Sequence, residues 1–493
     1  MAKPKYKTIC LAIFATALFI AGCGETDTSD IQQVNREPVI EPDYSGVTIP
    51  YNIAPMNFRI AEEGKNFLLK ITSSGGISKN IRSSDGNVIF APGFWRNLTE
   101  NNKGGAIEIE VIFENKEKQL LRYQPVRMKV SGDAIDPWLC YRLLYPGYES
   151  WVEMQLILRS IESHKEKCFV ENQLLEGNCI NCHSFNVNKA DRYLVHVRGS
   201  KGGTYLFDGK ELTRRTLRTE EMKANTVYPS WHPSGRFVAF STNRTVQSFH
   251  MKAGKNIEVT DLYSSLVIYD HEKNGISGID DSDTTEYMET YPFWSPDGRH
   301  LYYCRAVQVK EGFDYSRVKY DLVRKQFYIG TGEFGPAEVI FNASEKDRSV
   351  SFPAVSPDGK YLLFTLHDYG TFSIWHREAD LYLIDLNTMN SQWLPLNSNE
   401  TESYHSWSSN GRWIVFSSKR LDGLTARPFI AYFGSSDSVG KPFVLPQKDP
   451  SLYKRMEKTI NRPEFVQALP ESGPRDFMRA SKKPPQKAIW TGK

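Results

Sequence analysis

The clearest chemical signal in this sequence is a pair of cysteines followed by a histidine. They stand in the run Cys179-Ile180-Asn181-Cys182-His183, which has the C-x-x-C-H spacing of covalent c-type haem attachment. This spacing lets two thiols add to the vinyl groups of one haem, while the adjacent imidazole binds the iron. The residues therefore predict one haem c, with thioethers at Cys179 and Cys182 and with His183 as the proximal iron ligand.

Two other chemistries remain open for the same residues. The first is a local disulfide between Cys179 and Cys182, with His183 as a bystander. The second is half of a zinc site, but structural zinc takes four protein ligands, and the sequence has no second C-x-x-C and no H-x-x-x-H. Export to the cell envelope favours haem, because c-type haem is attached outside the cytoplasm.

The N-terminus has the features of an exported lipoprotein. Three lysines precede an apolar run over residues 9–21, which is typical of a secretory signal and too short for a transmembrane helix. The run ends in Ile20-Ala21-Gly22-Cys23, which resembles the bacterial lipobox. The resemblance implies removal of residues 1–22, a diacylglycerol on Cys23 and a membrane anchor. Gly24 gives no acidic retention signal, so we expect the outer membrane.

Three further cysteines belong to the predicted folded part. Cys140 and Cys168 could pair, because the envelope is oxidising and permits disulfides. Cys304 stands in an apolar run and is predicted to be a buried strand cysteine.

A repeat in the second half of the chain supplies the elements that must position the motif. Each copy starts with Tyr or Phe, continues through a Ser, Asp or Asn turn that ends in Gly and Arg or Lys, and leads into an apolar run. Pro and Asp or Ser set such a turn and Gly adopts its positive φ, so the unit predicts strand, tight turn and strand. The copies resemble the repeat of TolB-type β-propellers, whose blades have four strands. They cover residues 228–236, 291–299, 352–360 and 404–412.

A fifth, degenerate copy begins at Ser184-Phe185, so we predict five blades over residues 181–447. A ring of six blades is the alternative, if strands from elsewhere in the chain join it. His183 then falls at the end of an innermost strand, in the same slot as His405. The first and last blades of a closed ring of five are neighbours, which predicts His405 as the sixth iron ligand, or else His232 at the mouth of the next blade.

The flanking segments complete the predicted organisation. Residues 23–45 are polar and are interpreted as a tether. Residues 46–135 contain alternating apolar stretches, which predict a small antiparallel β-sandwich of the immunoglobulin-like kind. Within a linking segment over 136–180, apolar side chains recur at helical spacing and predict a helix over 148–164. Residues 448–493 are basic and punctuated by proline, which indicates a loosely ordered tail.

Composition and motifs exclude several classes of function. With 61 basic and 58 acidic side chains the net charge is only +3, so nucleic acid is not an expected partner. The run Gly330 to Gly335 matches G-x-G-x-x-G, but a strand pattern follows it where a dinucleotide site needs a helix. The sequence contains no G-x-S-x-G motif and therefore no nucleophile elbow of the α/β-hydrolase kind. We do not expect this protein to be an enzyme.

The lipobox, the sandwich, Asn181-Cys182-His183-Ser184-Phe185 and the repeats together resemble a family of exported TolB-like propeller lipoproteins from bacteria with two membranes. The resemblance covers most of the mature chain and implies a mainly β fold, but no established reaction. Two hypotheses follow. In the first, the protein is a haem c electron-transfer lipoprotein or part of a periplasmic redox complex. In the second, it is a non-enzymatic propeller that binds a protein, peptide or glycan, with Cys179 and Cys182 as a disulfide.

Overall fold

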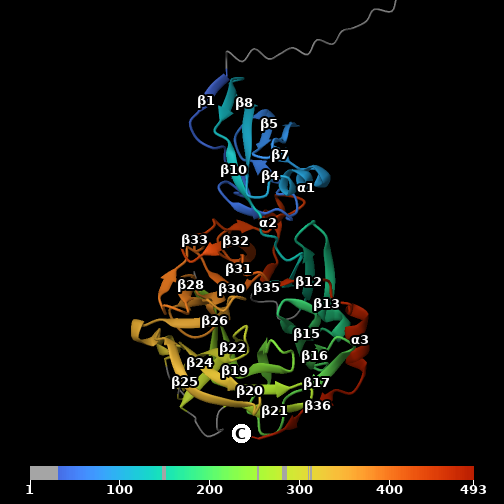
Figure 1. Cartoon of the computed structure of the whole chain (residues 1–493), viewed down its shortest axis with the longest axis vertical. Helices are drawn as coiled ribbons and strands as arrows, with labels where there is room; N and C mark the ends of the chain where they lie inside the picture. The colour runs from blue at the N-terminus through green and yellow to red at the C-terminus, as the bar shows by residue number, and fades with distance from the viewer. Residues whose placement is uncertain are drawn as a thin grey trace, which may run out of the picture.

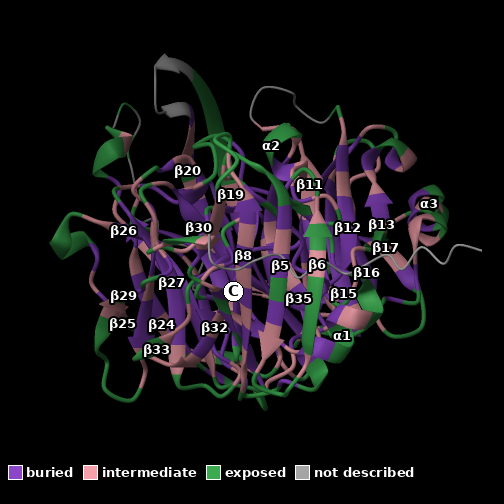
Figure 2. Ribbon diagram, turned by 90° about the horizontal axis from the view of Figure 1, so that it is seen from above, coloured by how far each residue is buried: buried purple, intermediate pink, exposed green. Residues whose placement is uncertain are grey.

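The computed structural model describes residues 31–146, 152–252, 255–279, 286–308, 310, 312 and 314–492. The chain is mainly β, as predicted, and forms a small N-terminal domain that stands on a larger ring of sheets (Figure 1). Buried residues follow the strands, and exposed residues gather in the connections between them (Figure 2). The predicted signal over residues 1–22 and the predicted lipid site at Cys23 lie outside the described residues.

The N-terminal domain packs a seven-stranded sheet against a three-stranded sheet and one helix, α1 (Pro92–Glu100). Both sheets contribute to one apolar core. Two strands join the large sheet in parallel, which departs from the expected antiparallel arrangement. The large sheet contains β1 (Ile31–Val34), β3 (Thr48–Pro50), β5 (Lys65–Ser73), β6 (Ser78–Ser83), β8 (Ala106–Glu114), β9 (Leu120–Tyr123) and β10 (Val126–Ser131), and the small sheet contains β2 (Ile40–Glu41), β4 (Phe58–Ile60) and β7 (Asn87–Val88).

The predicted tether over residues 23–45 is wrong for its described part. Strand β1 pairs with β9, and β2 pairs with β4, so the sandwich already begins at residue 31. The polar composition of this segment does not indicate strands, because β1 and β2 are short and only Ile40 among their residues is buried.

Six sheets form the ring, and the innermost strand of each contacts the innermost strand of the next. The first sheet is β14 (Cys179–Asn186), β15 (Lys189–Arg198), β16 (Gly203–Phe207) and β17 (Leu212–Thr216). The second is β18 (Thr226–Trp231), β19 (Phe237–Lys252), β20 (Lys255–Asp270) and β21 (Gly275–Gly278). The third is β22 (Tyr287–Trp294), β23 (His300–Val307), β24 (Asp321–Tyr328) and β25 (Glu333–Phe341).

The fourth sheet is β26 (Ser349–Val355), β27 (Tyr361–His367), β28 (Asp380–Asp385) and β29 (Ser391–Trp393). The fifth is β30 (Glu402–Trp407), β31 (Trp413–Ser418) and β32 (Arg427–Ser435), with β33 (Ser438–Val439) and β34 (Phe443–Val444) at its edge. The sixth is β35 (Thr459–Val466), β11 (Trp138–Leu144), β12 (Met154–Ser160) and β13 (Glu166–Glu171). Five of these sheets contain the predicted repeat, and the sixth pairs the late strand β35 with the earlier strand β11.

The sixth sheet corrects two predictions. The described part of the predicted helix over 148–164 is strand β12 and the turn after it, because its apolar residues are buried on both faces of a sheet and their helical spacing is incidental. The predicted loose tail over 448–493 is also wrong. Its β35 is the innermost strand of the sixth sheet, beside β11, and α2 (Leu452–Arg455) and α3 (Pro474–Lys482) flank it. The last strands, β36 (Gln486–Lys487) and β37 (Ile489–Trp490), extend the first two sheets.

The repeated turn has the chemistry that the sequence predicts. In the third sheet, Ser295 Oγ lies 2.6 Å from an Asp297 carboxylate oxygen and accepts the His300 N–H at 2.9 Å. Gly298 has φ of +71°, a conformation that costs other L-residues free energy. Tryptophans then join neighbouring sheets: the Trp407 indole N–H donates to the Ala354 carbonyl at 3.0 Å. No helix in the described part of the chain is long and apolar enough to span a membrane.

Candidate functional site

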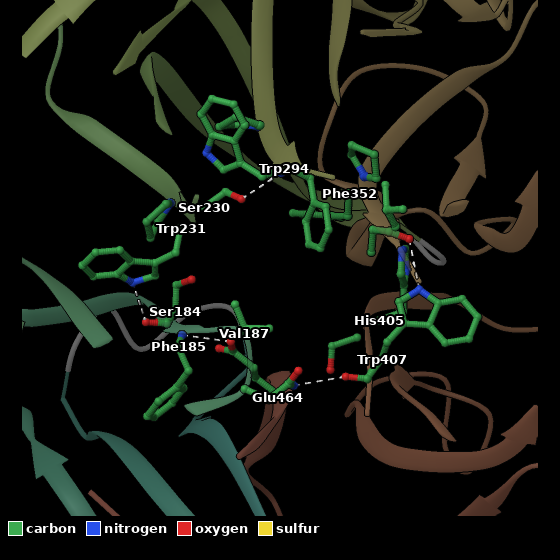
Figure 3. A pocket seen from close by; sticks show the side chains of 18 of the residues that line it. Ser184, Phe185, Val187, Ser230, Trp231, Trp294, Phe352, His405, Trp407 and Glu464 are labelled. Atoms are coloured by element: carbon green, nitrogen blue, oxygen red, sulfur yellow. Dashed lines mark hydrogen bonds between the residues drawn. The ribbon is translucent and has the colours of Figure 1, made fainter. Parts of the chain in front are cut away.

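A pocket of about 240 Å³ opens at the centre of the ring. All six innermost strands line it, so the pocket exists only because the ring is closed by β35. Figure 3 shows Ser184, Ser230, His405 and Glu464 around the opening, while tryptophans pack at its periphery. Its volume is slightly below the range of about 300 to 1,000 Å³ that is usual for sites of drug-sized ligands.

The floor of the pocket is built from one equivalent residue of each of five innermost strands, here called the axial residues. In five strands the axial residue has a positive φ of 50° to 53° and lies at a shift in the strand register. A left-handed conformation costs a non-glycine residue about 1 to 2 kcal/mol. The packing that closes the floor must therefore compensate this backbone strain at five positions. Those five residues are Tyr228, Tyr291, Phe352, Tyr404 and Arg462.

Aromatic packing closes most of this floor. The ring centroids of Tyr228 and Tyr291 are 4.5 Å apart, those of Tyr291 and Phe352 are 4.1 Å apart, and those of Phe352 and Tyr404 are 4.9 Å apart. The Arg462 guanidinium lies 5.9 Å from the Tyr228 centroid and 6.0 Å from the Phe352 centroid. One cation therefore occupies a place that aromatic side chains fill in four other strands.

In the sixth innermost strand, β14, the equivalent position is Cys182 of the predicted haem motif, which does not line the pocket. It precedes Ser184 by two residues in β14, as Tyr228 precedes Ser230 in β18. Arg462 Nη1 lies 3.6 Å from the Cys182 sulfur. A second guanidinium, Arg142, donates to the carbonyl and side-chain oxygens of Asn181, each at 3.2 Å. Two arginines from the sixth sheet thus hold the motif strand in place.

His183 is buried in the pocket wall as a neutral imidazole. Neither of its ring nitrogens has a hydrogen-bond partner among the described residues, and Nε2 lies 3.7 Å from a carboxylate oxygen of Glu464. Burial lowers the pKa of His183 to about 3. Burial also raises the pKa of Glu464 to about 8, although its other oxygen accepts the Phe185 N–H at 2.9 Å. Both groups are therefore mainly uncharged at neutral pH.

The two predicted distal ligands have different positions. His405 lines the same pocket as His183, its Nε2 lies 3.1 Å from the Leu363 carbonyl, and its Nδ1 has no partner among the described residues. His232 is not part of the lining, and its two nitrogens lie 2.8 Å from Ser234 Oγ and 3.0 Å from the Gly298 carbonyl. Since both nitrogens of His232 are occupied, His405 is the candidate that we retain.

The haem motif meets only part of the requirement for haem. The His183 imidazole fits an iron ligand, because it is neutral, unpaired and adjacent to the pocket. Cys179 and Cys182 are 4% and 1% exposed, and neither lines the pocket, so their thiols lie behind its wall. Both are free thiols, so the structure has no disulfide between them. The described residues contain no group of three or more His, Cys, Asp and Glu side chains that could hold a metal ion.

The other three cysteines of the described residues are free thiols on strands. Cys140 and Cys168 lie on β11 and β13, which are separated by β12, and both are free. Strands two places apart are about 9.5 Å apart, beyond the Cα separation that a disulfide spans. Cys304 is fully buried in β23, as predicted.

Sequence reasoning missed two residues of this site, Arg462 and Glu464. A signal was available: the run Arg462-Pro463-Glu464-Phe465 has the proline and the closing aromatic of Tyr228-Pro229-Ser230-Trp231. Its first residue is a cation rather than an aromatic, and no turn glycine follows, because the partner strand β11 comes from the other end of the chain.

Comparison with known proteins gives a general structural likeness. No protein-family model matches the chain, and no curated protein matches its sequence. The nidogen/laminin complex includes a chain that aligns over 67% of this chain and 99% of its own, with 8% identity and a TM-score of 0.39. Hydrazine synthase of Kuenenia stuttgartiensis aligns over 51% and 75%, with 12% identity and a TM-score of 0.29. A puromycin-hydrolyzing peptidase of Mycobacterium tuberculosis aligns over 62% and 53%, with 10% identity and a TM-score of 0.37. At these scores the likenesses carry no inference about activity.

Proposed function

We propose that this protein is an envelope lipoprotein that carries one c-type haem and acts in electron transfer. The observation that carries the proposal is the His183 imidazole, which is neutral, has no side-chain hydrogen bond among the described residues and lines the pocket directly after the C-x-x-C pair. We further propose that the six sheets are the blades of a TolB-type propeller that β35 closes, and that lipid on Cys23 anchors it in the outer membrane.

The chain's own residues would have distinct tasks. Cys179 and Cys182 would hold the haem through thioethers, His183 would bind the iron, and His405 would be the distal ligand. A bound haem supplies one-electron chemistry at a potential set by its axial ligands and its burial. Arg142 and Arg462 fix the motif strand, and the register shift between Ile180 and His183 lets the strand depart from regular alternation there. Because the thiols lie behind the wall, attachment requires them to turn toward the pocket.

The proposal is tested by expressing the mature chain in a periplasm that contains haem-maturation genes and staining a denaturing gel for haem. We expect the wild type to stain and the double variant Cys179→Ala/Cys182→Ala to remain unstained. Cys304→Ala is the matched control, since it removes a buried thiol elsewhere in the ring and must stain like the wild type. An unstained wild type with an intact 179–182 disulfide by mass spectrometry would end the proposal.

The distal ligand has its own test on the same preparation. We expect His405→Ala to change the absorption spectrum of the haem protein, and His232→Ala to leave it unchanged. An unchanged spectrum for His405→Ala would remove His405 from the iron.

A second function is favoured by one specific observation: neither thiol lines the pocket, whereas all six innermost strands do. We propose as this alternative that the protein is a binding module whose ligand, from a protein, peptide or glycan, enters the centre of the ring. A Ser230→Trp substitution would fill the pocket. We expect it to abolish binding of any ligand found by thermal-shift screening, and retained binding would place the ligand elsewhere.

A further inference from the structure

The guanidinium of Arg462 lies in the pocket floor without a counterion. Among the described residues, no carboxylate oxygen lies within 4.0 Å of its nitrogens. The one other formally charged residue in the described lining is Glu464, whose two oxygens face the Phe185 N–H and the His183 imidazole instead. The Arg462 guanidinium instead contacts the Cys182 sulfur, at 3.6 Å. Aromatic faces and a sulfur surround this partly buried cation, so its N–H donors remain available to a carboxylate.

The surroundings of this cation are apolar. Four prolines stand in the layer directly above the floor, and Phe293 and Ala354 line the wall. The floor itself is aromatic, and the guanidinium lies 5.9 Å from the ring centroid of Tyr228 and 6.0 Å from that of Phe352. Such walls favour a ligand with an apolar body, and the planar fork of Arg favours a carboxylate, which it can bind through two parallel hydrogen bonds. The prolines are Pro229, Pro292, Pro353 and Pro463.

We infer that the central pocket binds a small organic carboxylate, whose carboxylate group pairs with Arg462 and whose apolar body contacts the proline and aromatic walls. The inference deepens the second function proposed above and rests on the pocket being a ligand site. It does not require a haem. Where haem is attached, a haem propionate has the same chemistry as a free carboxylate, so the two sources must be distinguished experimentally.

The test compares benzoate with benzamide, which has the same shape and no charge, by isothermal titration calorimetry on the full mature chain prepared without haem-maturation genes. We expect benzoate to bind about 10- to 100-fold more tightly than benzamide, because a hydrogen-bonded ion pair is the difference between them. Arg462→Gln should reduce benzoate to the level of benzamide. Arg299→Gln, which removes an exposed arginine at a turn, is the control and should leave both affinities unchanged.

Arg462→Lys is the second variant, which keeps the positive charge but lacks the planar guanidinium that can form two parallel hydrogen bonds. We expect it to prefer benzoate over benzamide by less than the wild type does. A haem-loaded preparation separates the two sources: loss of benzoate binding on loading indicates that a propionate occupies Arg462, and retained binding indicates a free carboxylate.

Equal affinities for benzoate and benzamide in the wild type, or undiminished benzoate binding in Arg462→Gln, would overturn the carboxylate inference. In that case benzamide binding that Ser230→Trp abolishes would still support the pocket as a ligand site. If benzoate, benzamide, acetate and succinate all fail to bind the wild type, the carboxylate inference fails, while the second function is decided separately by the thermal-shift screen and Ser230→Trp. The haem proposal is untouched by these outcomes, because the gel stain measures it independently.

Discussion

Replacing Phe465 by Ala tests whether the C-terminal strand closes the ring. Phe465 is fully buried in β35, pairs with Leu139 of β11 and belongs to the largest apolar core of the molecule. Truncation of a buried phenylalanine costs about 3 to 5 kcal/mol, a large fraction of the roughly 5 to 15 kcal/mol that stabilises a typical domain. With an m value near 3 kcal/mol/M, the urea midpoint should fall by roughly 1 to 2 M.

The assay is urea unfolding followed by tryptophan fluorescence, because nine of the ten tryptophans lie after the N-terminal domain. Leu469→Ala is the matched control: this leucine follows β35, is 37% exposed and should cost no more than about 0.5 kcal/mol. If Phe465→Ala shifts the midpoint as little as Leu469→Ala does, β35 is not a closing strand, and the pocket built on it loses one wall.

Two further predictions concern the turns and the pocket. Gly298→Ala should destabilise the ring more than Gly359→Ala, although both glycines have nearly the same φ. A Cβ added at Gly298 would lie 2.3 Å from His232 Nε2, whereas one added at Gly359 would lie in open space. Equal unfolding midpoints for the two variants would refute this reasoning. The pKa of Glu464 is raised to about 8, so the folded protein keeps a proton on this carboxyl that the unfolded chain loses near pH 4.5. The contribution of Glu464 to stability is therefore present at pH 5 and is lost as the pH rises to 8. Glu464→Gln should therefore gain stability relative to the wild type over that interval, as measured by thermal unfolding, and a constant difference across the interval would contradict the sign.

The sequence predicted those parts of the fold that depend on local chemistry. The Ser-Pro-Asp-Gly turns and their flanking strands follow from side chains a few residues apart, such as Ser295, Asp297 and Gly298, and five sheets of the ring came from them. The sixth sheet depends on a pairing between Leu139 and Phe465 at opposite ends of the chain, which no local pattern records. The large separation in sequence also explains why Arg462 and Glu464 were not predicted, because they reach the haem motif only after the ring has closed.

The erroneous helix has a different physical cause. Strand β12 is buried on both faces, so it lacks the alternation that distinguishes a strand, and Met154, Leu158 and Ile161 then match a helical period by coincidence. The sequence did place His183 and His405 in equivalent positions, and the structure brings both to one pocket.

The most direct test of the central claim is the intact mass of the mature chain purified from a periplasm with haem-maturation genes. We predict a mass increased by one haem, and loss of that increment in Cys179→Ala/Cys182→Ala but not in Cys304→Ala. A wild-type mass without haem, reduced by two hydrogens through a bond between Cys179 and Cys182, would contradict the account.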